Sequence, residues 1–439
     1  MPAFFAFWAR RRATLRAALL ASACALLAAL PARAQTLSLD EAVRLALTRS
    51  RGLVATQAQA DAAREAAVAA GQRPDPVLKL GVINVPADGP DRGSLTRDFM
   101  TMRTIAVMQE FTRADKRQAR AARAAAEGQV AGAAGRQVSA EVQRDAALAW
   151  LERSYQQSLR DLLQAQEAQA ERQVQAVEAQ YRGRSSTLAE VFAARTEQEL
   201  LRDRIEQSDR AIAVATTQLA RWVGVVADQP LAARPAFARP AWTGADLAPQ
   251  MAAHPAVAAA AQQEVLAAAD VALARANRRA DWTVEFMYSQ RGPSYSNMLS
   301  LNLAVPLQWD RSQRQDRELA AASAMARRAA AEREERERAE QAQVRAMLQE
   351  WRSHEQRLAR NDASLLPLAS QRRDAALAAY RAGSGGSLTA VLEARRAEID
   401  TQAERLRIEL DIARLWAQLN YLMPPGDASA PPATARSPQ

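Results

Sequence analysis

Residues able to carry chemistry are few in this chain of 439 residues, and their spacing joins none of them into a catalytic set. Of the two histidines, His254 precedes Pro255 at the start of a helical pattern, and His354 lies in a charged stretch. We expect a surface or packing role for each. Because no catalytic triad, phosphate-binding loop or metal-ligand spacing is present, the sequence predicts no enzyme, no cofactor and no metal-ligand cluster.

Methionines offer a second chemistry, because thioether sulfur is a soft ligand for monovalent copper or silver. Five of them lie in predicted strands: Met100, Met102, Met108, Met287 and Met298. The first three share one face of their strand. We expect the face opposite Arg103 to be the lipid side, so apolar packing of these methionines is favoured over a metal relay.

The N-terminal 34 residues have the pattern of a secretory signal peptide. A basic region at Arg10–Arg12 precedes an apolar core at Ala17–Leu30 and a small-residue cleavage site at Ala32–Ala34. Two alternatives stay open: a transmembrane anchor, and a lipoprotein acylated on Cys24, the one cysteine of the chain. After this leader, no segment is predicted to be a transmembrane helix.

Cleavage of the leader changes the charge balance. The first 34 residues hold five arginines and no acidic residue, so the formal charge falls from 58 − 49 = +9 to 53 − 49 = +4. Mixed charges spread along helices do not indicate nucleic-acid binding. Without cysteine, disulfides and thiolate metal sites are excluded from the mature chain.

An internal duplication organises the rest of the chain. A Tyr-Arg-Gly turn at 181–191 returns as Tyr-Arg-Ala-Gly at 380–391, and both interrupt runs rich in Ala, Gln, Glu and Arg. The first repeat is predicted over 35–240 and the second over 241–423, before a disordered tail at 424–439. In order, the predicted elements are a helix capped by Ser38 over 37–72, strands over about 76–85 and 99–108, helices over about 112–180 and 189–222, strands over about 281–290 and 297–306, and helices over about 310–379 and 388–422.

The predicted strands have one apolar and one polar face. Trp282, Val284 and Phe286 alternate with Thr283 and Glu285, a pattern typical of a half-buried sheet. Two hairpins are marginal by themselves, and a barrel in a bilayer must close, which requires several copies of the chain. A soluble β-subdomain that faces a hydrophobic partner is the alternative.

This order of elements resembles the TolC-like outer-membrane factors of tripartite, RND-type efflux pumps. The resemblance covers about residues 37–423 and rests on the duplication, on the order strand, strand, long helix, turn and helix in each half, and on the paired turns. Short segments at 72–76, 84–86, 95–102 and 109–111 are most similar to the heavy-metal branch (cobalt-zinc-cadmium or copper-silver) of that family.

The resemblance implies a mainly α fold with a small membrane β part. Three chains would form a 12-stranded β-barrel continuous with a 12-helix α-barrel. Such a homotrimer would be a passive export duct for metal cations or small toxic compounds, from the periplasm to the exterior of a Gram-negative bacterium. Its expected partners are a periplasmic adaptor (membrane fusion) protein, an inner-membrane RND-type pump and outer-membrane lipid, with no nucleic acid.

The resemblance also points to residues at the two turns. Those implied to contact the adaptor are Tyr181, Arg182, Gly183, Ser185, Ser186, Leu188, Tyr380, Arg381, Gly383, Ser387 and Leu388. The plainer interpretation is hairpin chemistry, in which Gly is left-handed and Ser caps the returning helix. The first turn has its Gly one place earlier than the second and lacks the Ala.

Two acidic residues just past the turns, Glu190 and Glu393, occupy matching positions. In the family, carboxylates here form a ring at the tunnel mouth that concentrates cations. Arg182, Arg184 and Arg381 are expected to hold closed tips together by ion pairs. The alternative function is a soluble periplasmic coiled-coil adaptor or scaffold. An adaptor should have a single helical hairpin, so two hairpins favour the channel.

Overall fold

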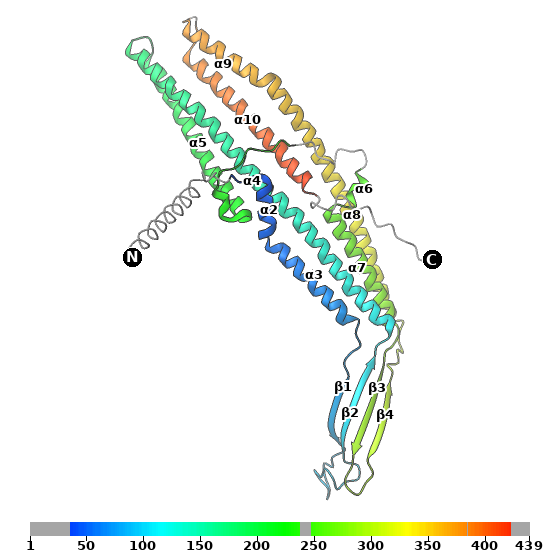
Figure 1. The fold of residues 1–439 in the computed structure, drawn as a ribbon. Helices are drawn as coiled ribbons and strands as arrows, with labels where there is room; N and C mark the ends of the chain where they lie inside the picture. Colours follow the sequence, from blue (N-terminus) through cyan, green and yellow to red (C-terminus); the bar gives the residue numbers. More distant parts are fainter. Residues whose placement is uncertain (1–35, 238–246, 384, 423–439) are drawn as a thin grey trace, which may run out of the picture.

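A computed structural model describes residues 36–237, 247–383 and 385–422, an elongated molecule with long helices at one end and a small sheet at the other (Figure 1). The predicted leader with Cys24 and the predicted tail lie outside the described residues. The elements are α2 (Leu39–Arg49), α3 (Arg51–Ala70), β1 (Val77–Ile83), β2 (Met102–Phe111), α4 (Ala114–Arg182), α5 (Leu188–Val223), a 3₁₀ turn (Gly224–Asp228), α6 (Ala248–Met251), α7 (Pro255–Asn277), β3 (Trp282–Gln290), β4 (Met298–Ala304), α8 (Gln315–Arg360), a π turn (Asn361–Leu365), α9 (Leu366–Arg381) and α10 (Leu388–Asn420).

The predicted helix over 37–72 is two helices, because Ser50 separates α2 from α3. Its backbone is extended (φ −65°, ψ 111°), and its hydroxyl accepts a hydrogen bond from Leu53 N at 3.3 Å, which caps α3. A serine side chain that bonds the following amides competes with a continuing helix. Ser38 caps α2 as predicted, accepting from Glu41 N at 3.2 Å.

The longest helix, α4, has 69 residues, which corresponds to about 100 Å. The prediction of one unbroken helix over 310–379 is wrong: α8 begins at Gln315, and a π turn at Asn361–Leu365 separates α8 from α9. Pro367 explains the interruption. Proline has no N–H for the carbonyl four residues earlier and its ring collides with that carbonyl, so the chain widens there.

The four strands form one antiparallel sheet in the order β1-β2-β3-β4, so the two hairpins pair side by side through β2 and β3. β2 begins at Met102, three residues later than predicted, and continues to Phe111. Asp98 accounts for the late start, since its carboxylate accepts hydrogen bonds from Met100 N at 2.8 Å and Thr101 N at 3.2 Å. This turn occupies backbone amides that a strand would use.

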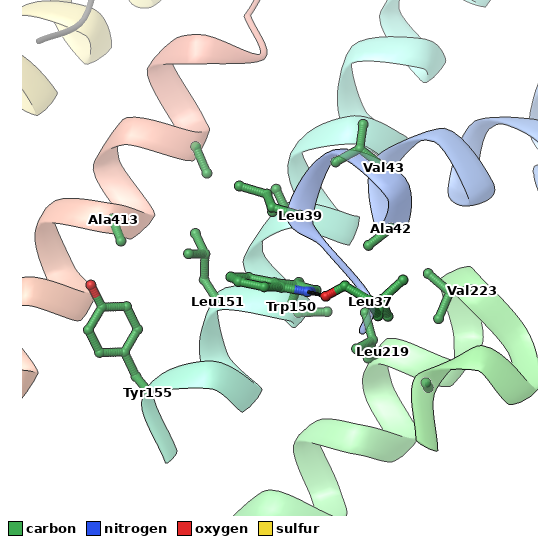
Figure 2. Close-up of a cluster of buried hydrophobic side chains, with 14 of the residues drawn as sticks. Leu37, Leu39, Ala42, Val43, Trp150, Leu151, Tyr155, Leu219, Val223 and Ala413 are labelled. Atoms are coloured by element: carbon green, nitrogen blue, oxygen red, sulfur yellow. Dashed lines mark hydrogen bonds between the residues drawn. The ribbon is translucent and has the colours of Figure 1, made fainter. Parts of the chain in front are cut away.

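Trp150 is the centre of the principal core, where α2, α4, α5 and α10 meet (Figure 2). The side chain is fully buried, and its indole Nε1 donates to Leu37 O at 2.9 Å. Leu37 also forms an isolated parallel bridge with Leu231. This core holds the start of the described chain and the end of the first repeat against the long helices.

The helix α7 is long and apolar enough to span a membrane by length and composition, with a mean hydropathy of 1.2. The prediction that no segment after the leader meets that test is therefore wrong. The helix is rich in alanine, whose small side chain scores as apolar and also permits close helix packing. In the fold α7 packs against α4 and α8 and precedes the second hairpin as α3 precedes the first (Figure 1). His254 caps it, its Nδ1 accepting from Ala256 N at 3.3 Å.

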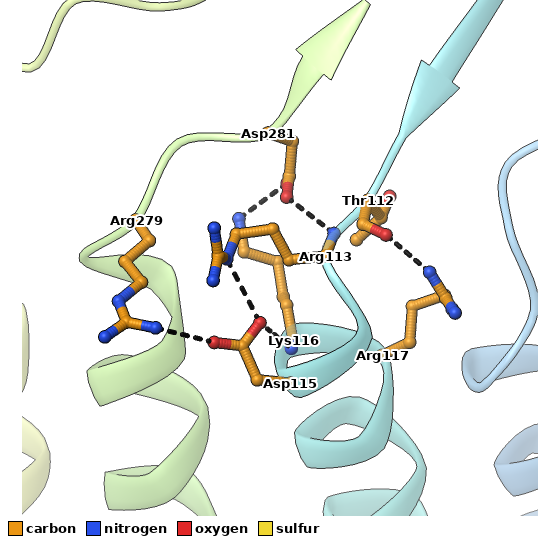
Figure 3. Close-up of polar contacts among 7 residues, drawn as sticks. All are labelled: Thr112, Arg113, Asp115, Lys116, Arg117, Arg279 and Asp281. Atoms are coloured by element: carbon orange, nitrogen blue, oxygen red, sulfur yellow. Dashed lines mark hydrogen bonds and ion pairs between the residues drawn. The ribbon is translucent and has the colours of Figure 1, made fainter.

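Ion pairs join the two repeats where the helices meet the sheet (Figure 3). Lys116 Nζ on α4 lies 2.6 Å from Asp281 Oδ2, just before β3, and both side chains are mostly buried. The other oxygen of Asp281 accepts from Arg113 N at 3.1 Å, and Arg279 pairs with Asp115 at 3.5 Å. These contacts fix the direction in which the sheet leaves the helical part.

Candidate functional site

The sheet separates apolar from polar side chains across its two faces. Strand register places the following residues on the apolar face: Leu78, Leu80, Val82, Arg103, Ile105, Val107, Gln109, Phe111, Trp282, Val284, Phe286, Tyr288, Gln290, Leu299, Leu301 and Leu303. The opposite face carries Val77, Lys79, Gly81, Ile83, Thr104, Ala106, Glu110, Thr283, Glu285, Ser289, Ser300, Asn302 and Ala304, with four methionines. Leu301 is 73% exposed in the single chain. An apolar sheet face left open in this way indicates a missing apolar environment.

The methionines lie on the polar face of the sheet, although the sequence predicts apolar packing for them on the side opposite Arg103. The register places Met102, Met108, Met287 and Met298 on the side of Lys79 and Glu285, whereas Arg103 lies on the apolar side; Met100 precedes β2. The sequence of β2 does not show which of its faces belongs to the apolar side of the sheet, because both faces contain apolar residues. Pairing with β3 decides the outcome, since Ile105 and Val107 face Tyr288 and Phe286.

An ion pair crosses the polar face. Lys79 Nζ on β1 lies 3.3 Å from Glu285 Oε2 on β3, diagonally across β2, where the small Ala106 is opposite Lys79 and Met108 is opposite Glu285. Ala106 is 3% exposed. Apart from Arg103, the charged side chains of the strands thus lie on the polar face, where charge is less costly than on the apolar face.

The first tip, residues 181–188, joins α4 to α5. Its Gly183 has φ −80°, and Arg184 adopts the left-handed conformation with φ 61°. The predictions of a left-handed Gly183 and of a serine cap are both wrong here. Thr187 caps α5, accepting from Glu190 N at 3.3 Å while the Glu190 carboxylate accepts from Thr187 N at 2.9 Å. The left-handed residue is the third after the tyrosine in both turns, and in the first turn that position holds Arg184 because the glycine comes one place earlier.

Glu190 is committed to this cap. Its carboxylate also accepts from Ser186 Oγ at 2.7 Å. The hydrogen bond from Thr187 N, then that from Ser186, lowers the pKa of Glu190 below its usual range. A carboxylate held by three donors of its own turn is less available to a passing cation than an unbound one.

The second tip, residues 380–388, follows the predicted chemistry. Gly383 is left-handed with φ 64°, and Ser387 caps α10 by accepting from Ala390 N at 3.2 Å. Leu388 is 1% exposed and packs among Val174, Val177 and other apolar residues of the first hairpin. The second tip is therefore anchored on the first hairpin.

A hydrogen bond connects the tip ends of the hairpins. Tyr380 Oη donates to Gln180 Oε1 at 3.0 Å. Burial raises the pKa of Tyr380, and the nearby Glu190 carboxylate raises it further. Of the predicted site residues, Tyr380 and Glu190 are thus brought near each other, whereas Glu393 is exposed on α10. The prediction that Glu190 and Glu393 occupy matching positions is wrong, because Glu190 is three residues after its cap Thr187 and Glu393 is six residues after its cap Ser387.

Ion pairs between the hairpins use other arginines than those predicted. Arg396 pairs with Glu197, and Arg204 pairs with Asp400 at 2.7 Å. Within the described ranges, Arg182, Arg184 and Arg381 are exposed and form no ion pair in the single chain. The expected tie between these three arginines and the tips is therefore not present within one subunit.

Sequence reasoning missed Gln180, Thr187, Glu197 and Glu398. Glu398 is buried and pairs with Arg373 at 2.6 Å within the second hairpin. A signal was available in the duplication, because Thr187 corresponds to Ser387 at the spacing of the repeat, and both cap the returning helix. Aligning the repeats position by position would have identified the threonine.

Comparison with protein-family models finds no match, and comparison with curated proteins finds none either. Solved structures do match. The outer-membrane channel OprN aligns over 88% of this chain and 89% of its own length, with a TM-score of 0.75 and 16% identity. CusC, described by its folding and transmembrane channel formation, aligns over 88% and 92%, with a TM-score of 0.75 and 16% identity. The CmeC outer membrane channel of Campylobacter jejuni aligns over 88% and 85%, with a TM-score of 0.72 and 11% identity.

These likenesses define the class of fold. The chain has the architecture of outer-membrane channels, with a small antiparallel sheet carried on long helical hairpins. This is the fold that the resemblance to TolC-like outer-membrane factors implies.

Proposed function

We propose that this protein is the outer-membrane channel subunit of a tripartite efflux pump. The observation that carries the proposal is the sheet, which has one exposed apolar face, one polar face, and an unpaired edge on each side, at β1 and at β4. In a bilayer an open sheet edge is not tolerated, so the edges must pair with other strands.

Pairing β4 of one copy with β1 of the next closes the sheet. Three copies would give 12 strands, an even number within the range of known barrels, with the apolar face toward lipid and the polar face toward water. Each chain presents four helical columns beside the sheet (α3, α4, α7 and α8) and four at the tips (α4, α5, α9 and α10) (Figure 1). The same three copies would give 12 helices at either level of a periplasmic tunnel.

Transport through such a tunnel is passive, so the energy comes from an inner-membrane RND-type pump joined through a periplasmic adaptor protein. The tips are the proposed contact with the adaptor. The first tip offers Tyr181 and Leu188, which are 44% and 48% exposed. The second tip offers Arg381, Gly383 and Ser387, whereas Leu388 is buried and stabilises the tip from within.

Opening of the tunnel requires the two hairpins of a subunit to separate at their ends. The contacts that resist this separation include the packing of Leu388 on the first hairpin, the Tyr380–Gln180 hydrogen bond, and the Arg396–Glu197 and Arg204–Asp400 ion pairs. The Arg204–Asp400 pair is exposed and contributes about 0–1 kcal/mol, whereas in the other pair Glu197 is buried and Arg396 is exposed. An adaptor that opens the tip must therefore overcome apolar packing as well as polar contacts.

Metal cations or small toxic compounds are the proposed cargo. Glu285 and Glu110 lie on the face assigned to the lumen, and Glu393 is exposed near the tip. Carboxylates along a narrow passage raise the local concentration of cations. The heavy-metal branch of the family fits this arrangement.

The test is expression of the full chain in a Gram-negative host, followed by outer-membrane extraction in detergent and single-channel recording. We expect heat-sensitive trimers that conduct ions. Leu301→Arg, at the middle of the apolar face, should lose trimers, because an arginine at the bilayer midplane costs about 2–4 kcal/mol. The matched control is Ser300→Arg on the polar face, which should keep the trimer and change its conductance.

The soluble-adaptor alternative makes the opposite prediction. A mature chain that stays monomeric and dispersed without detergent, with Leu301→Arg and Ser300→Arg behaving alike, would refute the channel.

A further inference from the structure

One charged side chain interrupts the apolar face of the sheet. Arg103 on β2 lies beside Val82 of β1 and opposite Gln290 of β3. Among the described residues of the four strands, it is the single charged member of that face, and it is exposed. It needs an explanation, because a cation on a lipid-facing strand is costly at the bilayer midplane and tolerated near the interface.

The position of Arg103 along the face is consistent with an interface. At the helix end of the face, Phe111 stacks on Trp282 with ring centroids 4.4 Å apart. Arg103 lies eight residues from Phe111 along β2, which is about 26 Å of strand, or about 20 Å of height when the strand is tilted. An apolar band of a barrel is about 25 Å tall with aromatic residues at its boundaries. If Phe111 and Trp282 mark the periplasmic boundary, Arg103 lies within about 5 Å of the distal one.

The distal end also carries a second fixed guanidinium. Arg291 Nε donates to Phe99 O at 2.9 Å, and the guanidinium lies 5.1 Å from the Tyr295 ring. The two hairpin loops touch beneath it, since a Cβ on Gly292 would lie 1.9 Å from Thr96 O. The loops thus present positive charge at a rigid rim rather than on a free segment.

We propose that Arg103 binds a phosphate group of the phosphorylated glycolipid in the distal leaflet of the membrane, a lipid of the lipid A class. The inference rests on the proposed outer-membrane function. A guanidinium matches two phosphate oxygens with two parallel N–H donors. Gln290, directly opposite, and Tyr288, diagonally opposite, add neutral hydrogen-bonding groups on the same face.

The leaflet follows from the direction of the molecule. The long helices lie at the Phe111 end of the sheet, so the Arg103 end is the one farthest from the periplasm (Figure 1). In a Gram-negative outer membrane that leaflet is built of phosphorylated glycolipid, whereas phospholipid forms the periplasmic leaflet. Charge complementarity with a lipid that carries phosphates accounts for an arginine at this depth.

The test measures lipid binding to the purified trimer in neutral detergent by native mass spectrometry, with bis-phosphorylated lipid A as the probe. We expect Arg103→Gln to weaken binding about tenfold, the loss of one charge-assisted hydrogen-bonding group. The control Arg92→Gln removes an exposed positive charge from the β1–β2 loop, outside the strands, and should change binding less than about twofold.

Equal binding by Arg103→Gln and wild type would overturn the proposal, and so would phosphatidylglycerol binding with the same dependence on Arg103. The trimer is verified first in the same spectra. If wild type forms no trimer in detergent, the proposed channel function fails; if it forms trimers that bind lipid A independently of Arg103, the lipid site fails and the channel stands.

Discussion

The two helical tips are related by duplication, yet they occupy different environments. Leu188 in the first tip is 48% exposed, and its counterpart Leu388 in the second is 1% exposed. The first tip is held by hydrogen bonds of its own turn, through Thr187 and Glu190. The second is held by packing against the first hairpin. Equivalent residues of a repeat can thus have different roles: Leu188 is exposed on the surface of the first tip, and Leu388 anchors the second tip by packing.

The difference begins with one residue of turn length. The second turn has an additional Ala before its left-handed Gly383, while the first places Arg184 in that conformation. A non-glycine residue in the left-handed region is strained. The reciprocal Thr187–Glu190 cap offsets that strain, and no packing of Leu188 is required.

The largest expected effect distinguishes the two leucines. Leu388→Ala should destabilise the trimer by about 2–4 kcal/mol, because it removes a buried side chain and leaves a cavity between the hairpins. Leu188→Ala should cost under about 0.5 kcal/mol. Thermal or denaturant unfolding of the detergent-solubilised trimer measures both. Equal losses would mean that a sister subunit covers Leu188 as fully as the chain covers Leu388.

The caps should give the next effect. Thr187→Ala removes one half of a reciprocal pair and should cost about 1–2 kcal/mol, and Ser387→Ala about 1 kcal/mol or less. The same unfolding measurement applies, with Thr187→Ser as the variant that keeps the cap. A larger loss of stability for Ser387→Ala than for Thr187→Ala would contradict this order. It would mean that the Ser387 cap also maintains the packing of the second tip on the first hairpin.

Glycine substitution sharpens the comparison further. Gly383→Ala should cost about 1 kcal/mol, since its φ of 64° is unfavourable for any residue with a Cβ. Gly183→Ala should be neutral or slightly stabilising, because φ there is −80°. In the first tip, Arg184→Gly should increase the free energy of unfolding by up to about 1 kcal/mol, because the left-handed residue there is Arg184. If Gly183→Ala proves the more damaging, the turn must rearrange in the trimer.

Much of the fold is readable from sequence, and the failures have physical causes. Alternation identifies β3 and β4 because Trp282, Phe286 and the leucines of β4 all lie on one face. β2 has apolar residues on both faces, so cross-strand pairing with β3 decides which of them join the apolar face of the sheet, and no single strand reveals that pairing. The break between α8 and α9 could have been predicted from Pro367, because proline interrupts the hydrogen bonding of a helix. Arg396–Glu197 and Tyr380–Gln180 join residues about 200 positions apart, and only the packed hairpins bring them together.

The smallest expected effects distinguish the carboxylates of Glu190 and Glu393. Glu190 is bound by its own turn, which lowers its pKa, so it contributes stability above the ordinary carboxyl range. That stability is lost as the pH falls through the lowered pKa, because protonation ends the acceptor role. Glu190→Gln should therefore flatten the acid branch of the pH–stability profile while leaving ion selectivity nearly unchanged.

Glu393 should behave in the opposite way. It is exposed on α10, so Glu393→Gln should leave stability nearly unchanged. In a planar bilayer it should lower the cation-to-anion permeability ratio by less than about tenfold, since a threefold ring of exposed charges acts only through the local field and is screened by salt. If Glu190→Gln changes selectivity and Glu393→Gln does not, the first tip faces the passage and the roles of the two tips are exchanged. If neither variant changes it, the carboxylates of the polar sheet face, Glu110 and Glu285, become the next residues to test.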